Sequence, residues 1–92
     1  MSTVDVDCTG VTTEEAFWDR YVYIVKPHGA EFFGRNLDAF WDAIDGGGPG
    51  FPEQDVVRFI NTDDLKRIKG GSFYKTLCEL AKESRCGVVT FE

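Results

Sequence analysis

The stretch of sequence that decides the fold is Asn36 to Gly48, which reads NLDAFWDAIDGGG. Asparagine is a favoured residue at helix N-termini, and a run of three glycines from Gly46 ends a helix. Between them, four apolar residues recur at positions i, i+3, i+4 and i+7, namely Leu37, Phe40, Trp41 and Ile44. This spacing places them on one side of an α-helix, so the sequence predicts a helix over 36–45 whose apolar stripe faces the core.

Three carboxylates share a second face of the same predicted helix. At about 100° per residue, Asp38, Asp42 and Asp45 form a stripe roughly 100° away from the apolar one. Like charges four residues apart repel by a few tenths of a kcal/mol, and the helix dipole disfavours anions in the C-terminal half. The stripe is either an ordinary solvated helix face or a set of carboxylates kept for a partner whose cations relieve the repulsion.

The sequence before this helix predicts one strand and one helix. Thr3–Val6 is short and alternates β-branched residues with aspartate, which predicts a strand. Thr12 and Glu15 then have the spacing of a capping box, and Pro27 requires the helix to end before it. The apolar residues of this helix are Ala16, Phe17, Val22 and Ile24. His28, the only histidine, falls in the following loop and is interpreted as a turn residue rather than a catalytic base.

The sequence after the glycine run predicts a mostly apolar strand at Val56–Ile60. Thr62 is placed to cap a short helix over 63–69, and Ser72 is placed to cap a last helix. The last helix carries apolar residues at helical spacing, namely Phe73, Leu77, Leu80 and Ala81. The segment 88–91, which reads VVTF, predicts a final strand.

Length and element order together predict the architecture. A chain of 92 residues, 42% of them hydrophobic, is expected to fold as one domain over 1–92. Parallel strands need crossover connections, and helical segments separate the three predicted strands. The predicted fold class is therefore α/β, with a three-stranded parallel sheet packed with about four helices.

The charge of the chain restricts its partners. Sixteen acidic residues against ten basic ones give a net charge of −6, so the chain lacks the clustered cations that binding to nucleic acid requires. A basic protein is the expected partner, although an acidic surface also serves solubility. Exposed neighbouring aspartates on one helix lack the unequal environments that acid–base catalysis needs, so no enzymatic activity is expected.

The cysteines and the N-terminal segment indicate a compartment. Cys8, Cys78 and Cys86 show no CxxC spacing and have no histidine pair nearby, so neither a zinc site nor a disulfide framework nor any cofactor is expected. They are interpreted as small buried hydrophobes. Asp5 and Asp7 lie where a signal peptide would need an apolar core, and no run of about 18 apolar residues suits a membrane helix. A cytoplasmic protein with reduced thiols and no membrane contact is expected.

The segment that leads into the acidic helix has a recognisable pattern. Residues 32–42 read FFGRNLDAFWD, which resembles the signature of the barstar family, with phenylalanine in place of the usual first tyrosines. The resemblance extends over nearly the whole chain, because the strands and helices follow in the family's order with a one-residue insertion in the glycine loop. It implies a barstar-like fold with a cis Phe51–Pro52 peptide bond. It also implies an inhibitor of a barnase-class ribonuclease, of the immunity-protein or antitoxin kind.

The resemblance further implies how such a protein acts. Family members place this helix and its adjoining loop in the catalytic cleft of the ribonuclease, where carboxylates take the place of RNA phosphates. Asp42 matches the central anchor, Asp38 the second acidic contact, and Phe32 the aromatic residue that stacks against the enzyme. The partner-binding residues implied are Phe32, Phe33, Gly34, Asn36, Asp38, Trp41, Asp42, Asp45, Gly46, Gly47 and Leu80. The expected partner is a small basic extracellular-type ribonuclease or ribonuclease toxin, and the free protein is expected to be a monomer.

Three positions depart from the family pattern. Gly47 replaces a tryptophan in the loop after the helix, and Leu80 replaces an acidic residue on the last helix, with Glu79 beside it. Arg35 stands where the family has an acid and lies three residues before Asp38, whose charge it is predicted to neutralise in part. We infer a cognate ribonuclease different from the family's usual one. The alternative is an acidic module of the same fold that binds a basic non-nuclease protein or another toxin.

Overall fold

Three short parallel strands form a sheet in the order β1-β2-β3. The computed structural model describes residues 2–84 and 87–92. Val57 of the central strand lies opposite Val4 on one side and Val89 on the other. The predicted parallel sheet is confirmed, and its strands are β1 (Thr3–Asp7), β2 (Val56–Ile60) and β3 (Val89–Phe91).

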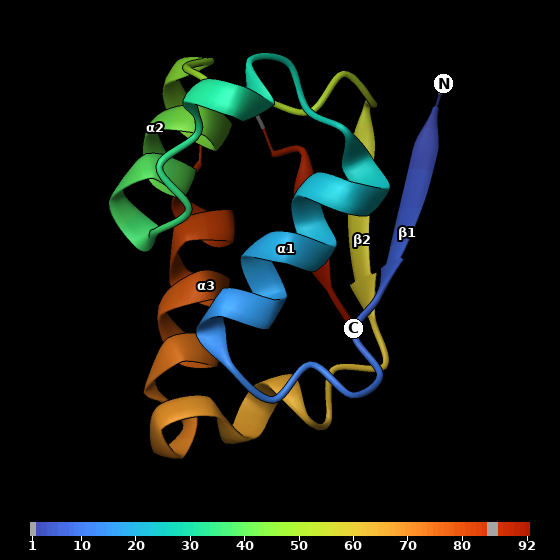
Figure 1. The fold of residues 1–92 in the computed structure, drawn as a ribbon, viewed down its shortest axis with the longest axis vertical. Coiled ribbons are helices and arrows are strands. Elements are labelled where there is room, and N and C mark those ends of the chain that lie inside the picture. Colours follow the sequence, from blue (N-terminus) through green and yellow to red (C-terminus); the bar gives the residue numbers. More distant parts are fainter. Residues whose placement is uncertain (1, 85–86) are drawn as a thin grey trace.

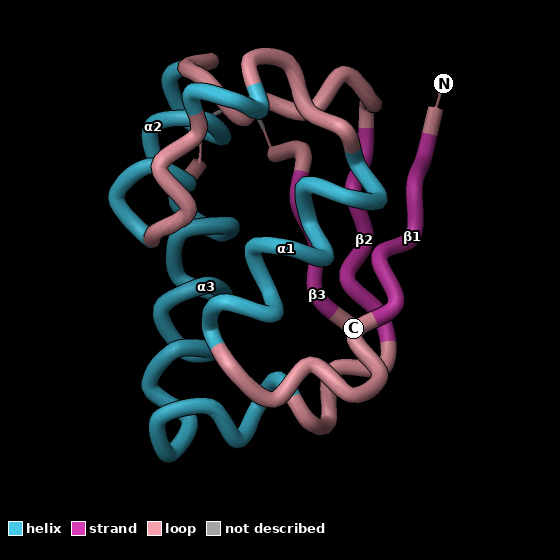
Figure 2. The backbone as a smooth tube through the Cα atoms, viewed as in Figure 1, coloured by secondary structure: helices cyan, strands magenta, loops and turns pink. Residues whose placement is uncertain are grey.

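Helical segments connect the strands, as the backbone trace in Figure 2 shows. Within the described residues these are the α-helices α1 (Glu14–Val25), α2 (Leu37–Gly46) and α3 (Ser72–Glu83) and the 3-10 helices η1 (Ala30–Phe32) and η2 (Leu65–Gly71). The predicted number of about four helices is slightly off, because the short helix expected over 63–69 is a 3-10 helix and a further 3-10 turn precedes α2. None of the helices that the structure describes has the length and apolar character needed to cross a membrane.

The helices cover one face of the sheet, and the opposite face carries polar residues. Figure 1 shows α1, α2 and α3 on the same side of the strands. Strand residues alternate between the two faces, so Val6 and Phe59 are fully buried, whereas Asp5 and Arg58 lie on the outer face. There the Arg58 guanidinium donates two hydrogen bonds to the Asp5 carboxylate, at 2.7 and 2.9 Å. The fold therefore has two layers with one core between them.

The core consists largely of stacked and edge-on aromatic rings. Phe17 and Tyr21 of α1 lie over Phe59 of β2, with ring centroids 5.1 and 6.1 Å apart. Phe40 of α2 meets Trp18 with centroids 5.4 Å apart. Of the apolar residues expected on the first helix, Phe17 is confirmed as buried, and Trp18 and Tyr21 are buried beside it, because their rings contribute large apolar areas to the core. The buried residues are Phe17, Trp18, Tyr21 and Val25, whereas Ala16, Val22 and Ile24 are partly buried.

Three hydroxyls that were predicted to cap helices do not do so. Thr13, not Thr12, caps α1, and its hydroxyl oxygen accepts the backbone N–H three residues later at 3.1 Å. The Thr62 hydroxyl donates to the Glu92 carbonyl at 2.7 Å and so joins the end of β2 to the chain after β3. Ser72 is the first residue of α3, and its hydroxyl donates back to a carbonyl three residues earlier at 3.0 Å. The hydroxyls of Thr62 and Ser72 therefore donate to backbone carbonyls and do not accept from a helix N-terminus.

The peptide bond before Pro52 is trans, which corrects the cis bond implied by the family resemblance. The structure contains no cis peptide bond among the residues it describes. Phe51 N donates to the Gly48 carbonyl at 3.1 Å, and the Phe51 carbonyl accepts from His28 N at 3.1 Å. These hydrogen bonds are made with the trans isomer, which is also the lower-energy form of a peptide bond that precedes proline.

Candidate partner-binding site

The start of α2 is fixed by one asparagine side chain. Asn36 Oδ1 accepts from Ala39 N at 2.8 Å, which confirms the predicted N-cap, and Asn36 Nδ2 donates to the Gly34 carbonyl at 3.1 Å. A Cβ on Gly34 would lie only 3.1 Å from the Ala39 Cβ. The glycine therefore lets the preceding loop pass close to the helix. The Asn36 hydrogen bonds and the close approach at Gly34 together hold the first turn of α2 in one orientation.

The buried side of α2 is narrower than the predicted stripe. Phe40, Ala43 and Ile44 are fully buried, and Phe40 and Ile44 confirm the prediction. Leu37 and Trp41 are only partly buried, so Trp41 lies at the boundary between the core side of the helix and its surface. Ala43, which the apolar stripe did not include, is the third buried residue of the helix.

The outer side of α2 presents two unpaired carboxylates. Asp38 and Asp42 are exposed, and neither forms a hydrogen bond or ion pair with any described residue. Asp45 differs, since it is partly buried and has an interaction partner within the protein. The two free carboxylates are four residues apart, one turn along the same face, where like charges repel. The structure therefore keeps two of the three predicted acids available to a partner.

The C-terminal end of α2 is closed without a basic side chain. Gly47 has a left-handed φ of +73°, Gly47 N donates to the Ala43 carbonyl at 3.1 Å and Gly48 N donates to the Asp42 carbonyl at 3.2 Å. The first of these hydrogen bonds is that of the αL C-cap motif, and together the two bonds satisfy carbonyls that helix geometry leaves open. Ser84, the residue after α3, donates a hydrogen bond from its Oγ to the Ile44 carbonyl at 2.8 Å. Gly46 and Gly47 are exposed at this end, beside the acidic face.

The two neighbouring phenylalanines before α2 have opposite environments. The Phe32 side chain is 75% exposed, whereas Phe33 is 6% exposed. The Phe33 ring lies 5.9 Å from the Trp18 ring and 5.8 Å from the Tyr21 ring, and a Cβ on Gly50 would lie 2.5 Å from it. Phe33 thus anchors the loop in the core, while Phe32 offers a free aromatic surface.

A buried tyrosine and backbone hydrogen bonds hold the two loops beside α2 together. Tyr21 Oη donates to the Gly50 carbonyl at 2.7 Å, and burial raises the pKa of Tyr21 above its usual range, which keeps the hydroxyl a donor. Gly50 N donates to the His28 carbonyl at 2.8 Å. His28 is exposed, as predicted, and it forms an isolated antiparallel bridge with Phe51. The loop before α2 and the loop after it therefore form one supported surface.

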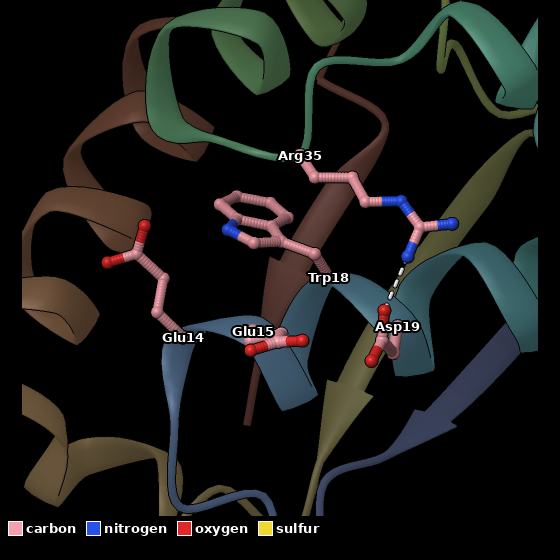
Figure 3. Close-up of a pocket in the computed structure, with 5 residues that line it drawn as sticks. All are labelled: Glu14, Glu15, Trp18, Asp19 and Arg35. Carbon is pink, nitrogen blue, oxygen red and sulfur yellow. Dashed lines mark hydrogen bonds and ion pairs between the residues drawn. The ribbon is translucent and has the colours of Figure 1, made fainter.

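Arg35 pairs with a residue that the sequence analysis did not single out. Figure 3 shows its guanidinium directed away from α2 toward Asp19 of α1, with which it forms an ion pair. The predicted neutralisation of Asp38 by Arg35 is therefore wrong, because Arg35 pairs with Asp19. Both members of the pair are about half exposed, so the pair itself contributes little to stability. A contact between residues 16 positions apart leaves no local signal in the sequence.

The remaining candidates lie outside this surface or are not arranged for chemistry. Leu80 is partly buried and packs against the core, whereas its neighbour Glu79 is exposed. Cys8 is buried and unpaired, and burial raises the pKa of its thiol to about 11. Cys78 is partly buried, and Cys86 lies outside the described residues. No cluster of His, Cys, Asp or Glu in the described part of the chain is arranged to hold a metal ion.

These features define a class: a small parallel α/β protein that displays a rigid, acid-bearing helix between two supported loops. A family model described as Barstar (barnase inhibitor) matches residues 1–86, which is nearly the whole chain. The chain therefore belongs to the barstar family. The members of this family are inhibitors of barnase-type ribonucleases and are not themselves enzymes. A search of the curated proteins finds no match.

Proposed function

We propose that this protein inhibits a barnase-class ribonuclease one-to-one by inserting α2 and its flanking loops into the catalytic cleft. The observation that carries the proposal concerns Asp38 and Asp42, which are exposed on one face of a helix that is capped at both ends. Neither has a hydrogen bond or ion pair with the described residues. Family membership supports a ribonuclease as the kind of partner. The setting we propose is protection of the cytoplasm of a cell that makes or meets the ribonuclease.

The chemistry of the cleft explains why carboxylates would block it. A ribonuclease holds a phosphodiester with cationic side chains, and a carboxylate offers an arginine the same planar pair of anionic acceptors. Asp42 would be the central anchor and Asp38 the second contact. Docking would also relieve the repulsion between these two charges, so part of the binding energy would come from a strain present in the free inhibitor. A carboxylate side chain offers no bond that the enzyme can cleave.

The surrounding residues would act in two ways. Phe32, Trp41, Gly46 and Gly47 are exposed or partly exposed beside the acidic face and would contact the partner directly. Phe33, Gly34 and Asn36 shape the loop and the first turn, so their contribution would be largely preorganisation. Asp45 and Leu80 have contacts within the protein and would lie at the edge of the interface.

The net charge of −6 would steer the inhibitor toward a basic enzyme. Association should therefore slow as salt rises, because screening shortens the range of the attraction. Since the acidic face must be open to the enzyme, we expect the free inhibitor to be a monomer.

RNA cleavage by a panel of small barnase-class ribonucleases tests the proposal. Wild-type protein at equal molarity should silence at least one enzyme, and Asp42→Asn should restore cleavage. Asp63→Asn is the matched control, because Asp63 is an exposed acid three residues after β2 that has no hydrogen bond or ion pair with the described residues. The end of β2 lies away from α2 in Figure 1. Tight binding to an enzyme that still cuts RNA would contradict an active-site plug and would indicate a module for another basic surface.

A further inference from the structure

A hollow lies beside the acidic helix, between the loop before α2 and the glycine loop after it. Its volume is about 480 Å³. One wall is formed by the segment from His28 to Phe32, including Glu31, and the other by Gly47–Pro49. Because Gly47 is the residue that ends α2, the hollow adjoins the surface that the proposed inhibitor presents to its ribonuclease.

Both walls of the hollow are fixed by backbone hydrogen bonds. On the first wall, Phe32 N donates to the Gly29 carbonyl at 2.9 Å, and the His28 carbonyl accepts from Gly50 N at 2.8 Å. On the second wall, Gly48 N donates to the Asp42 carbonyl at 3.2 Å. A side chain that entered the hollow would therefore not need to order a loop first, which lowers the entropic cost of binding.

No side chain of the described residues fills the space next to Gly47. A Cβ on Gly47 would have no other atom within 4 Å, and its left-handed φ of +73° disfavours a side chain there. The hollow is therefore open toward the same side as the end of the acidic helix.

The lining residues select a chemistry for what enters. Phe32 presents an aromatic ring that is 75% exposed, and the neighbouring Glu31 presents an exposed carboxylate with no partner among the described residues. Among the described residues, no lysine or arginine lines the hollow. A guanidinium can stack on an aromatic face and donate two hydrogen bonds to a carboxylate, whereas an apolar side chain would desolvate Glu31 without pairing it.

We propose that this hollow receives an arginine side chain of the ribonuclease, held between the Phe32 ring and the Glu31 carboxylate. The proposal rests on the proposed function and adds to it a contact that does not involve Asp38 or Asp42. Because such an arginine need not take part in catalysis, this contact selects among ribonucleases whose catalytic residues are the same. The hollow is thus a specificity pocket beside the blocking helix.

The test uses the ribonuclease that wild-type protein inhibits most strongly in the cleavage panel, with dissociation rates measured by surface plasmon resonance. Glu31→Gln and Phe32→Leu should each raise the dissociation rate about 3- to 30-fold, the range of a desolvated cation–π or charge-assisted contact. Tyr23→Leu and Glu53→Gln are matched controls and should leave the rate unchanged, because Tyr23 is 77% exposed and Glu53 is exposed and unpaired. Replacing the contacting arginine of the enzyme with alanine should abolish the effect of Glu31→Gln.

Each alternative result has its own meaning. If Phe32→Leu raises the dissociation rate and Glu31→Gln does not, the occupant of the hollow is an apolar side chain and not an arginine. If both variants bind like wild type while Asp42→Asn is impaired, the hollow lies outside the interface and only this inference fails. If Asp42→Asn also binds like wild type, or if no enzyme of the panel is inhibited, the proposed function fails and this inference with it.

Discussion

The variant Asp42→Asn is expected to make the free protein more stable while it weakens inhibition. The Asp42 carboxylate is exposed and unpaired, lies one turn after Asp38, and is in the half of α2 where the helix dipole disfavours an anion. Relief of the repulsion between the two aspartates contributes about 0.2 to 0.5 kcal/mol, and relief of the dipole interaction contributes about 0.3 kcal/mol or more. The free energy of unfolding should therefore rise by about 0.5 to 1 kcal/mol, or about 2 to 8 °C in Tm for a domain of this size.

The companion variant Asp38→Asn separates these two effects. Asp38 lies in the first turn of α2, where the dipole favours an anion, so relief of the repulsion is offset by loss of that attraction. Its free energy of unfolding should stay within about 0.5 kcal/mol of wild type. Urea titrations followed by circular dichroism measure both variants. A destabilised Asp42→Asn, or equal shifts for the two variants, would refute the argument that α2 carries an electrostatic strain kept for binding.

Three further predictions concern the support of the site and the stability of the fold. Tyr21→Phe should lower the free energy of unfolding by about 1 to 3 kcal/mol, because the Gly50 carbonyl loses its buried donor; an unchanged urea midpoint would contradict this. Gly47→Ala should lower the free energy of unfolding by about 1 kcal/mol in the same titration, since φ is +73° there. An unchanged free energy would show that the loop can relax. The pKa of Asp7 is lowered to about 2, mainly by hydrogen bonds from the Thr9 hydroxyl and backbone N–H. Asp7 therefore contributes stability above about pH 4 that is lost as the pH falls toward 2. In the variant Asp7→Asn, the urea midpoint of unfolding should depend less on pH over that range.

The secondary structure around α2 was readable from the sequence because its signals are local. Asn36 caps the helix within three residues, and the glycine run from Gly46 ends it within two. The central strand β2 (Val56–Ile60) was predicted with its observed bounds, since a short apolar run bounded by polar residues has few other interpretations. The parallel sheet then followed from the order of the elements alone.

The errors arose where the outcome depends on residues far away in the sequence. The Thr62 hydroxyl donates to a carbonyl 30 residues later, which no local pattern of capping residues indicates. On α1 the sequence offers two apolar arcs, and only the position of the sheet shows that the arc with Trp18 and Tyr21 is the buried one. Helical periodicity predicts that one side is buried but does not decide between two apolar sides.

The candidate site shows the same division between local and long-range information. Asp38 and Asp42 were placed on one face by helical spacing, and the structure shows both of them exposed. The sequence does not distinguish the two adjacent phenylalanines, of which Phe33 anchors the loop and Phe32 stays exposed. The difference arises from the contact of Phe33 with Trp18, which is distant in the sequence. The hollow between the two loops was not foreseen, since it is formed by segments about 18 residues apart in the chain that lie together only in the folded structure.

Competition with a small phosphate ligand tests the central claim most directly. The inhibited ribonuclease is titrated with wild-type protein at rising concentrations of a nucleoside 3′-monophosphate, which occupies the phosphate site of the cleft. If the α2 carboxylates take the place of RNA phosphates, the apparent Kd should rise in proportion to nucleotide concentration, and complex and nucleotide should not coexist. A Kd that stays constant at saturating nucleotide would contradict the account, because inhibitor and phosphate would then occupy different sites.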